Sequence, residues 1–208
     1  MNVIRGFAII LSVAFAGALY AQESPWSGEF GGGWSLPESA TADKLNSGWH
    51  VMGGALLHLN ERLALRFDAQ YDRFDASRAT LESLKVPDAY AEVWTGTGGL
   101  QWTLNPQSSL RIYGFGNVGG YYKRAVATRP TLVPGVICDP FWDFCFEGVV
   151  PADTVLGTKS NTTFGGNAGV GVEFGMPRRT SLFIEAKYQW VSAGQAVEYV
   201  PVTVGFRW

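Results

Sequence analysis

The stretch that decides the fold is the last ten residues, Tyr199-Val200-Pro201-Val202-Thr203-Val204-Gly205-Phe206-Arg207-Trp208. Apolar side chains occupy every second position from Val200 to Trp208, and smaller or polar residues stand between them. This alternation predicts a β-strand with one apolar face. The ends of soluble domains usually fray, so a patterned strand at the C-terminus indicates a structural or recognition role for Phe206 and Trp208.

Seven further stretches alternate in the same way, most clearly residues 63–74. The eight predicted strands cover residues 26–35, 48–59, 63–74, 91–104, 109–123, 163–175, 181–191 and 199–208. Tight connections follow the second, fourth and sixth strands, and longer ones follow the others, which predicts an antiparallel up-and-down meander. The longest connection, residues 124–162, exceeds what a compact domain normally leaves without structure, so we expect it to be functional or disordered.

The N-terminus has the composition of a signal peptide. Arg5 precedes an apolar run at residues 7–18, and the small residues Ala18 and Ala21 suit a cleavage site, so residues 1–21 are predicted to be removed and residues 22–208 to form one barrel domain. An uncleaved helical anchor is the alternative. No later stretch reaches eighteen consecutive apolar residues, so we expect no helical membrane span.

The two faces of the strands differ in a way that distinguishes a soluble barrel from a membrane barrel. The polar face carries charges of both signs in equal number: Glu29, Asp68, Asp72, Glu173 and Glu185 with Arg66, Arg111, Lys123, Lys187 and Arg207. The apolar face ends in two aromatic bands: Trp102, Phe174 and Trp208 near the tight turns, and Tyr71, Trp94, Tyr122, Tyr188 and Trp190 near the long connections. Aromatic bands around an aliphatic belt are typical of strands that face lipid. The sequence therefore predicts an all-β protein, an eight-stranded antiparallel up-and-down transmembrane β-barrel.

These features, together with the glycine-rich runs at residues 113–121 and 167–173, make the chain resemble a family of small bacterial outer-membrane barrels. That family comprises the outer-membrane protein A transmembrane domain, outer-membrane protein X and the opacity proteins. The resemblance implies a bacterial outer-membrane protein in contact with outer-membrane lipids. It also implies that the barrel-assembly machinery recognises the last strand through Phe206 and Trp208, although the family usually ends in phenylalanine. We expect a monomer with a structural or adhesin-like role, no enzymatic activity and no cofactor. The net charge of −2 gives no basic footprint for nucleic acid.

The inward charges predict an ion-pair network. Eight strands enclose a space only wide enough for side chains, and unpaired buried charges are costly. We therefore expect the network to plug the barrel; a narrow or gated pore for small solutes is the alternative. The predicted members are Arg66, Asp68, Arg111, Glu173, Glu185 and Lys187.

A second alternative is a membrane enzyme. If the tight turn after the second strand pairs it with the third, His50 and Asp72 face each other near the long connections, with Ser77 just beyond. These residue types resemble those of outer-membrane lipid A acyltransferases, and a histidine beside a carboxylate can act as a general base. A structural hydrogen bond between His50 and Asp72 is the simpler interpretation.

The long connection carries the remaining candidates. Cys138 and Cys145 are predicted to form a disulfide in an oxidising compartment; a metal site lacks nearby ligands. Phe141, Trp142, Phe144 and Phe146 lie inside or beside that ring, as a contact surface for a host or surface ligand would require. Their alternative role is to cap the barrel rim, and the acidic residues Asp139, Asp143 and Glu147 lack the spacing of a known calcium loop.

Overall fold

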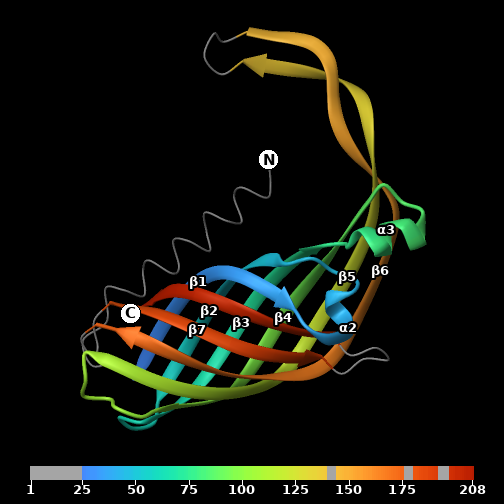
Figure 1. Cartoon of the computed structure of the whole chain (residues 1–208). Coiled ribbons are helices and arrows are strands. Elements are labelled where there is room, and N and C mark those ends of the chain that lie inside the picture. Colours follow the sequence, from blue (N-terminus) through green and yellow to red (C-terminus); the bar gives the residue numbers. More distant parts are fainter. Residues whose placement is uncertain (1–24, 140–143, 176–179, 192–196) are drawn as a thin grey trace.

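The computed structural model describes residues 25–139, 144–175, 180–191 and 197–208, and they form a closed barrel (Figure 1). Eight strands follow one another around it in chain order, each antiparallel to its neighbours, and the last pairs with the first. The strands are β1 (Trp26–Pro37), β2 (Gly48–His58), β3 (Leu63–Asp75), β4 (Asp88–Thr103), β5 (Leu110–Asp139), β6 (Phe144–Phe174), β7 (Ser181–Val191) and β8 (Val197–Arg207). The predicted fold class is confirmed.

The predicted signal peptide lies outside the described residues. None of the helices in the described part is long and apolar enough to cross a membrane. We call the end with the C-terminus and the tight connections the turn end, and the opposite end, with the long connections, the loop end (Figure 1).

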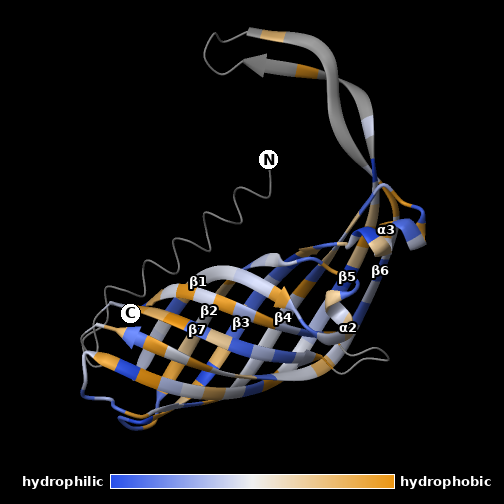
Figure 2. Cartoon of the chain, viewed as in Figure 1, coloured by the Kyte–Doolittle hydropathy of each residue, from blue (hydrophilic) through white to orange (hydrophobic). Residues whose placement is uncertain are grey.

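Side chains alternate across the barrel wall as the sequence requires. Along β7, Phe183 and Glu185 are buried inside, whereas Leu182 and Ile184 point outward and are about two-fifths exposed. Figure 2 shows the same alternation of hydrophobic and hydrophilic positions along the strands. A slip of one residue would place the inward charges in lipid, so the two-residue period holds each strand in register.

The C-terminus completes the closure. Beyond the β1–β8 ladder, Gly28 and Trp208 exchange two backbone hydrogen bonds of 2.9 Å. A Cβ at Gly28 would lie 2.8 Å from the indole ring of Trp208, so only glycine lets the ring pack against β1 here. Phe206 is 57% exposed on the outer wall.

The prediction that β5 and β6 end near residues 123 and 163 is wrong. Their pairing continues, with one register shift at Ala127/Thr128, as far as Asp139↔Phe144. Beyond the last partner of β5 on β4, Thr128, and the last partner of β6 on β7, Gly165, the two arms have only each other. We call Thr128–Asp139 paired with Phe144–Val155 the ribbon; Figure 1 shows it running past the loop end.

Three prolines in the ribbon explain why the sequence indicates a loop. Pro130, Pro134 and Pro151 cannot donate a backbone hydrogen bond. They lie in the pairs Pro130↔Asp153, Leu132↔Pro151 and Pro134↔Val149, which are every second pair of the ladder. Antiparallel pairs alternate between hydrogen-bonded and non-hydrogen-bonded, so all three prolines fit the class whose nitrogen points away from the partner arm.

Two connections at the loop end, residues 38–47 and 76–87, each contain a short helix, and we call them together the lid. α2 (Ser39–Ala42) lies between β1 and β2, and α3 (Arg78–Leu84) between β3 and β4. The two connections are joined by an isolated bridge between Leu45 and Ala76. The backbone nitrogen of Glu38 also donates to the carbonyl of Glu198 at 2.9 Å, which ties the first connection to β8.

Candidate functional site

Arg66 is the centre of the buried charge network. Its guanidinium lies 2.8 Å from Glu29, 2.9 Å from Asp68 and 2.9 Å from Glu185, and its side chain is completely buried. The contact with Glu185 is bidentate, with Nη1 and Nη2 each donating at 2.9 Å. One face of the same guanidinium lies 4.1 Å from the centre of the Phe115 ring, so the cation has partners at its N–H edge and on one face.

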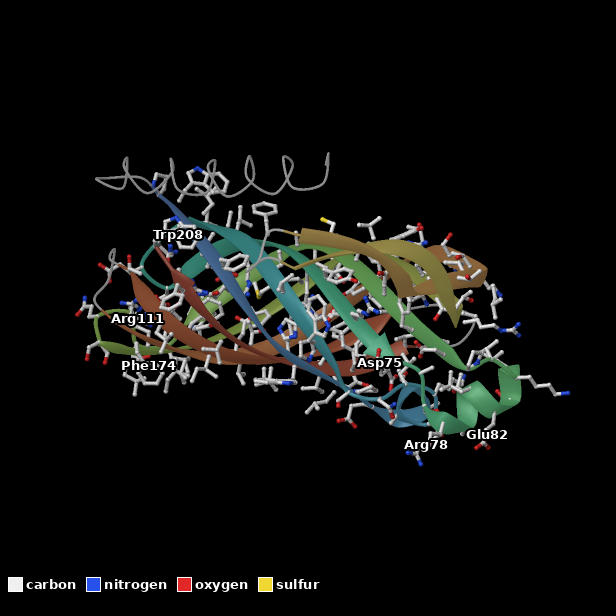
Figure 3. All side chains as sticks on the ribbon, turned by 90° about the horizontal axis from the view of Figure 1, so that it is seen from above. Asp75, Arg78, Glu82, Arg111, Phe174 and Trp208 are labelled. Carbon is white, nitrogen blue, oxygen red and sulfur yellow. The ribbon has the colours of Figure 1, made fainter. Side chains whose placement is uncertain are left out.

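A second group of charges lies nearer the turn end. Arg207 contacts Glu29 at 2.6 Å and Glu173 at 2.7 Å, and Glu173 also pairs with Arg111. Figure 3 shows Arg111 at the end of the barrel that holds Trp208, opposite the end that holds Asp75. Because Glu29 touches both Arg66 and Arg207, the two groups form one continuous network.

The structure brings all six predicted network residues into the lumen. Lys187 is the most loosely held: its ammonium lies 4.0 Å from Asp68. The prediction left Glu29 and Arg207 out of the network, although it placed both on the inward face. It also missed the neutral partners that complete the hydrogen bonds of the carboxylates: Tyr113 on Glu185, Ser181 on Glu173 and Asn117 on Asp68.

An apolar cluster closes the lumen toward the loop end. The sequence does not predict it, because the inward face of the strands is expected to be polar. Phe74, Val93, Tyr121, Val191 and Tyr199 are each at most 2% exposed, and Leu45 of the lid packs against them. The rings of Phe74 and Tyr199 meet edge to face at 5.2 Å. We call these five residues and Leu45 the seal. The inward phase of the five strand residues is visible in the sequence, since each lies an even number of residues from a buried polar position on its own strand.

His50 and Asp72 are register partners across β2 and β3, as the predicted turn requires. A hydroxyl joins them, whereas the sequence predicts a direct hydrogen bond. Ser35 on β1 donates to Asp72 Oδ1 at 2.6 Å and lies 3.1 Å from His50 Nδ1, while His50 Nε2 lies 2.8 Å from the hydroxyl of Thr203. Ser35, His50 and Asp72 are each at most 1% exposed.

Ser77 does not join this cluster, which corrects the arrangement expected for an acyltransferase. It is the N-cap of α3: its hydroxyl accepts from the backbone nitrogen of Thr80 at 3.3 Å and donates to the carbonyl of Asp43 at 2.8 Å. Ser35 cannot replace it as an accessible nucleophile, because Ser35 is fully buried and its proton is held by Asp72. The His50 cluster is therefore a structural element of the wall. Within the described residues, no group of three or more His, Cys, Asp or Glu side chains could hold a metal ion.

The ribbon carries the other candidates. Phe141 and Trp142 lie outside the described residues, and Phe144 and Phe146 belong to β6. Cys138 and Cys145 are register partners. This pair lies an even number of pairs along the ladder from the proline pairs, so it belongs to the same non-hydrogen-bonded class. In that class the opposite Cα atoms come closest together, at about 4.5 Å. A disulfide between them remains a prediction, and the register suits it.

A closed barrel with apolar side chains outside and paired charges inside defines the class of integral membrane barrels. The chain belongs to the family of the outer membrane protein beta-barrel domain, whose model matches residues 7–208. It is thus a protein of the bacterial outer membrane, and its outer wall faces the lipids there. Among curated proteins, no sequence matches this chain.

Several solved structures are similar in fold. The crystal structure of Neisserial surface protein A has a TM-score of 0.55 at 14% identity and covers 88% of this chain and 96% of its own. That of Ail, the attachment invasion locus protein of Yersinia pestis, in complex with the heparin analogue sucrose octasulfate, has a TM-score of 0.50 at 11% identity. It covers 88% of this chain and 97% of its own. Identities this low establish the fold alone.

Proposed function

We propose that the protein is a non-conducting, non-enzymatic outer-membrane protein with a structural or surface-interaction role, and that the ribbon is its contact element. The observation that supports this is the contrast between the two ends of β5 and β6. Within the barrel they enclose a lumen filled by ion pairs and covered by the seal. Beyond Thr128, β5 continues for eleven residues to Asp139, a length of about 37 Å at about 3.4 Å per residue.

A barrel that served only as a membrane anchor would have no use for such an extension. Two strands without other partners are marginally stable in water. A disulfide between Cys138 and Cys145 would lower the conformational entropy of the unfolded ribbon. For a loop this small, the folded ribbon would be stabilised by about 2–3 kcal/mol. A stiffened ribbon loses less conformational entropy when it binds a surface. Ail, one of the structurally similar barrels, is by its title an attachment protein crystallised with a heparin analogue, which supports a contact role by analogy of fold.

The experiment replaces residues 129–154 by a two-residue Asn-Gly turn and compares this variant with wild type on the surface of bacteria that do not otherwise attach. Adhesion is scored on plates coated with heparin and with epithelial-cell matrix. We expect the ribbonless protein to keep its heat-modifiable gel mobility and to lose attachment, and Cys138→Ser to show a partial loss. Equal attachment with and without the ribbon would refute the proposed contact role.

The pore is the second candidate, and it depends on the polar interior. We expect no single-channel conductance from wild type in planar bilayers, because Arg66 and its carboxylates fill the section below the seal. Reproducible conductance steps in wild type would show that the lumen opens, and the pore would then replace the structural role.

A further inference from the structure

A row of charged side chains crosses the outer wall near the loop end. Arg73 on β3 is the register partner of Trp49 on one side and of Glu92 on the other, and Glu92 is the partner of Arg124 on β5. Residues adjacent to Arg73 along the chain, such as Asp72, point into the lumen. Arg73, Glu92 and Arg124 therefore lie side by side on the surface that faces the membrane. We call these three residues the charged row.

The charged row lies just outside an aromatic band. Two residue pairs closer to the turn end, the outward positions are Tyr71, Trp94 and Tyr122, which are also register partners. The ring centres of Tyr71 and Trp94 are 4.6 Å apart, and Trp94 is 55% exposed. Aromatic bands of this kind lie at the boundary between hydrocarbon and headgroups. Two residues along a strand span about 6.8 Å, which puts the charged row at the depth of the lipid headgroups. Outer-membrane barrels carry their longer connections on the extracellular side, so these headgroups belong to the outer leaflet.

The contacts within the charged row leave N–H groups of Arg73 and Arg124 available to donate hydrogen bonds to a ligand. The guanidinium of Arg73 lies over the ring of Tyr90 at 4.2 Å, a contact that uses the face of the group and leaves its N–H edge available. Arg124 Nη1 is 3.6 Å from Glu92 Oε2, beyond hydrogen-bond distance, and the Arg124 side chain is 42% exposed. Glu92 Oε1 instead accepts from the hydroxyl of Tyr71 at 3.0 Å.

The charged row has a net charge of +1, and its two arginines stand on strands separated by one other strand, about 10 Å apart at the backbone. Long side chains can converge across that distance on one tetrahedral anion, which arginine recognises through paired N–H groups. From these observations we propose that Arg73 and Arg124 bind the phosphorylated headgroup of an outer-leaflet lipid, with Glu92 and Tyr90 orienting the two guanidinium groups. This inference does not depend on the role of the ribbon.

The test measures binding of one defined lipid to the full-length mature protein in a neutral detergent. The probe is diphosphoryl lipid A, with the same lipid after phosphate removal as the reference, titrated by native mass spectrometry. The variants are Arg73→Gln/Arg124→Gln and Arg73→Lys/Arg124→Lys. The control is Arg78→Gln, which removes one positive charge from α3, beyond the strands at the same end of the barrel (Figure 3), whereas the double glutamine variant removes two.

We expect the double glutamine variant to bind the phosphorylated lipid about tenfold or more weakly, since each lost charge-assisted hydrogen bond is worth about a factor of ten. Arg78→Gln should bind like wild type, and the dephosphorylated lipid should not distinguish the variants. The lysine variant should keep part of the affinity, and it preserves the test should the glutamine variant lose its folded gel mobility. Equal affinity of wild type and both arginine variants, or full competition by millimolar inorganic phosphate, would overturn the lipid assignment.

Discussion

Arg66→Met removes the one guanidinium that three buried carboxylates share. Glu29 keeps Arg207 at 2.6 Å, and Asp68 keeps an amide donor from Asn117, but Glu185 keeps only the hydroxyl of Tyr113 at 3.0 Å. Removing one member of a buried ion pair costs about 3–5 kcal/mol, because the remaining charge is uncompensated. We therefore expect the free energy of unfolding to fall by about that amount. Adding Glu185→Gln to this variant should restore part of the loss, because the least compensated carboxylate is then neutral.

The assay is equilibrium unfolding by urea in phosphatidylcholine vesicles, followed by tryptophan fluorescence and by gel mobility. Arg62→Met is the matched control, since Arg62 is exposed on the tight connection after β2, and such surface changes usually stay within about 0.5 kcal/mol. If Arg66→Met were no more destabilising than Arg62→Met, the lumen would be hydrated enough to screen these charges, and the plug would be refuted. The same result would favour the pore.

Two matched pairs of substitutions test the wall itself in the same unfolding assay. A Cβ at Gly99 would lie 2.0 Å from the carbonyl oxygen of Gly116, whereas one at Gly96 meets nothing within 4 Å. Gly99→Ala should therefore destabilise the barrel by more than about 1 kcal/mol and Gly96→Ala should be neutral or stabilising by about 0.5 kcal/mol; equal effects would contradict the close approach of β4 and β5. Ser35→Ala leaves a buried carboxylate and imidazole without their shared hydroxyl and should cost about 1–3 kcal/mol. Ser77→Ala removes the N-cap of α3 and the hydrogen bond to the carbonyl of Asp43, both within the lid. It should speed proteolysis of the lid without lowering the stability of the barrel, and a larger loss of stability from Ser77→Ala than from Ser35→Ala would show that the buried cluster is unimportant.

The inward or outward direction of a side chain could be predicted from the sequence because it depends only on a local period of two. Arg66 and Glu185 were assigned to the lumen on this basis, although they lie on strands far apart in the chain. The position of an inward residue along the barrel axis could not be predicted, since it depends on how far each strand is displaced along its neighbour. For this reason the seal residues Phe74 and Tyr199 were missed: their phase is visible, but their meeting at one level of the lumen is not.

The ribbon and the contact of Ser35 with His50 and Asp72 do not follow from the sequence, for different reasons. Prolines at 130, 134 and 151 are ordinary loop signals, and only the pairing of two arms shows that they are compatible with a ladder. Ser35 reaches His50 and Asp72 from a third strand, so no single turn predicts the contact. The sequence suggests Ser77 because it is close to Asp72 along the chain, whereas its local geometry commits its hydroxyl to the start of α3.

The proline positions of the ribbon bear on how densely this protein can populate a membrane. A long two-stranded element offers unpaired backbone groups along both edges, and copies held in one plane would be expected to join edge to edge into a continuous sheet. Pro130 and Pro134 remove two donors from the free edge of β5, and Pro151 removes one from that of β6. Neighbouring molecules therefore lack an unbroken edge to share, which disfavours edge-to-edge joining of their ribbons even at high surface density.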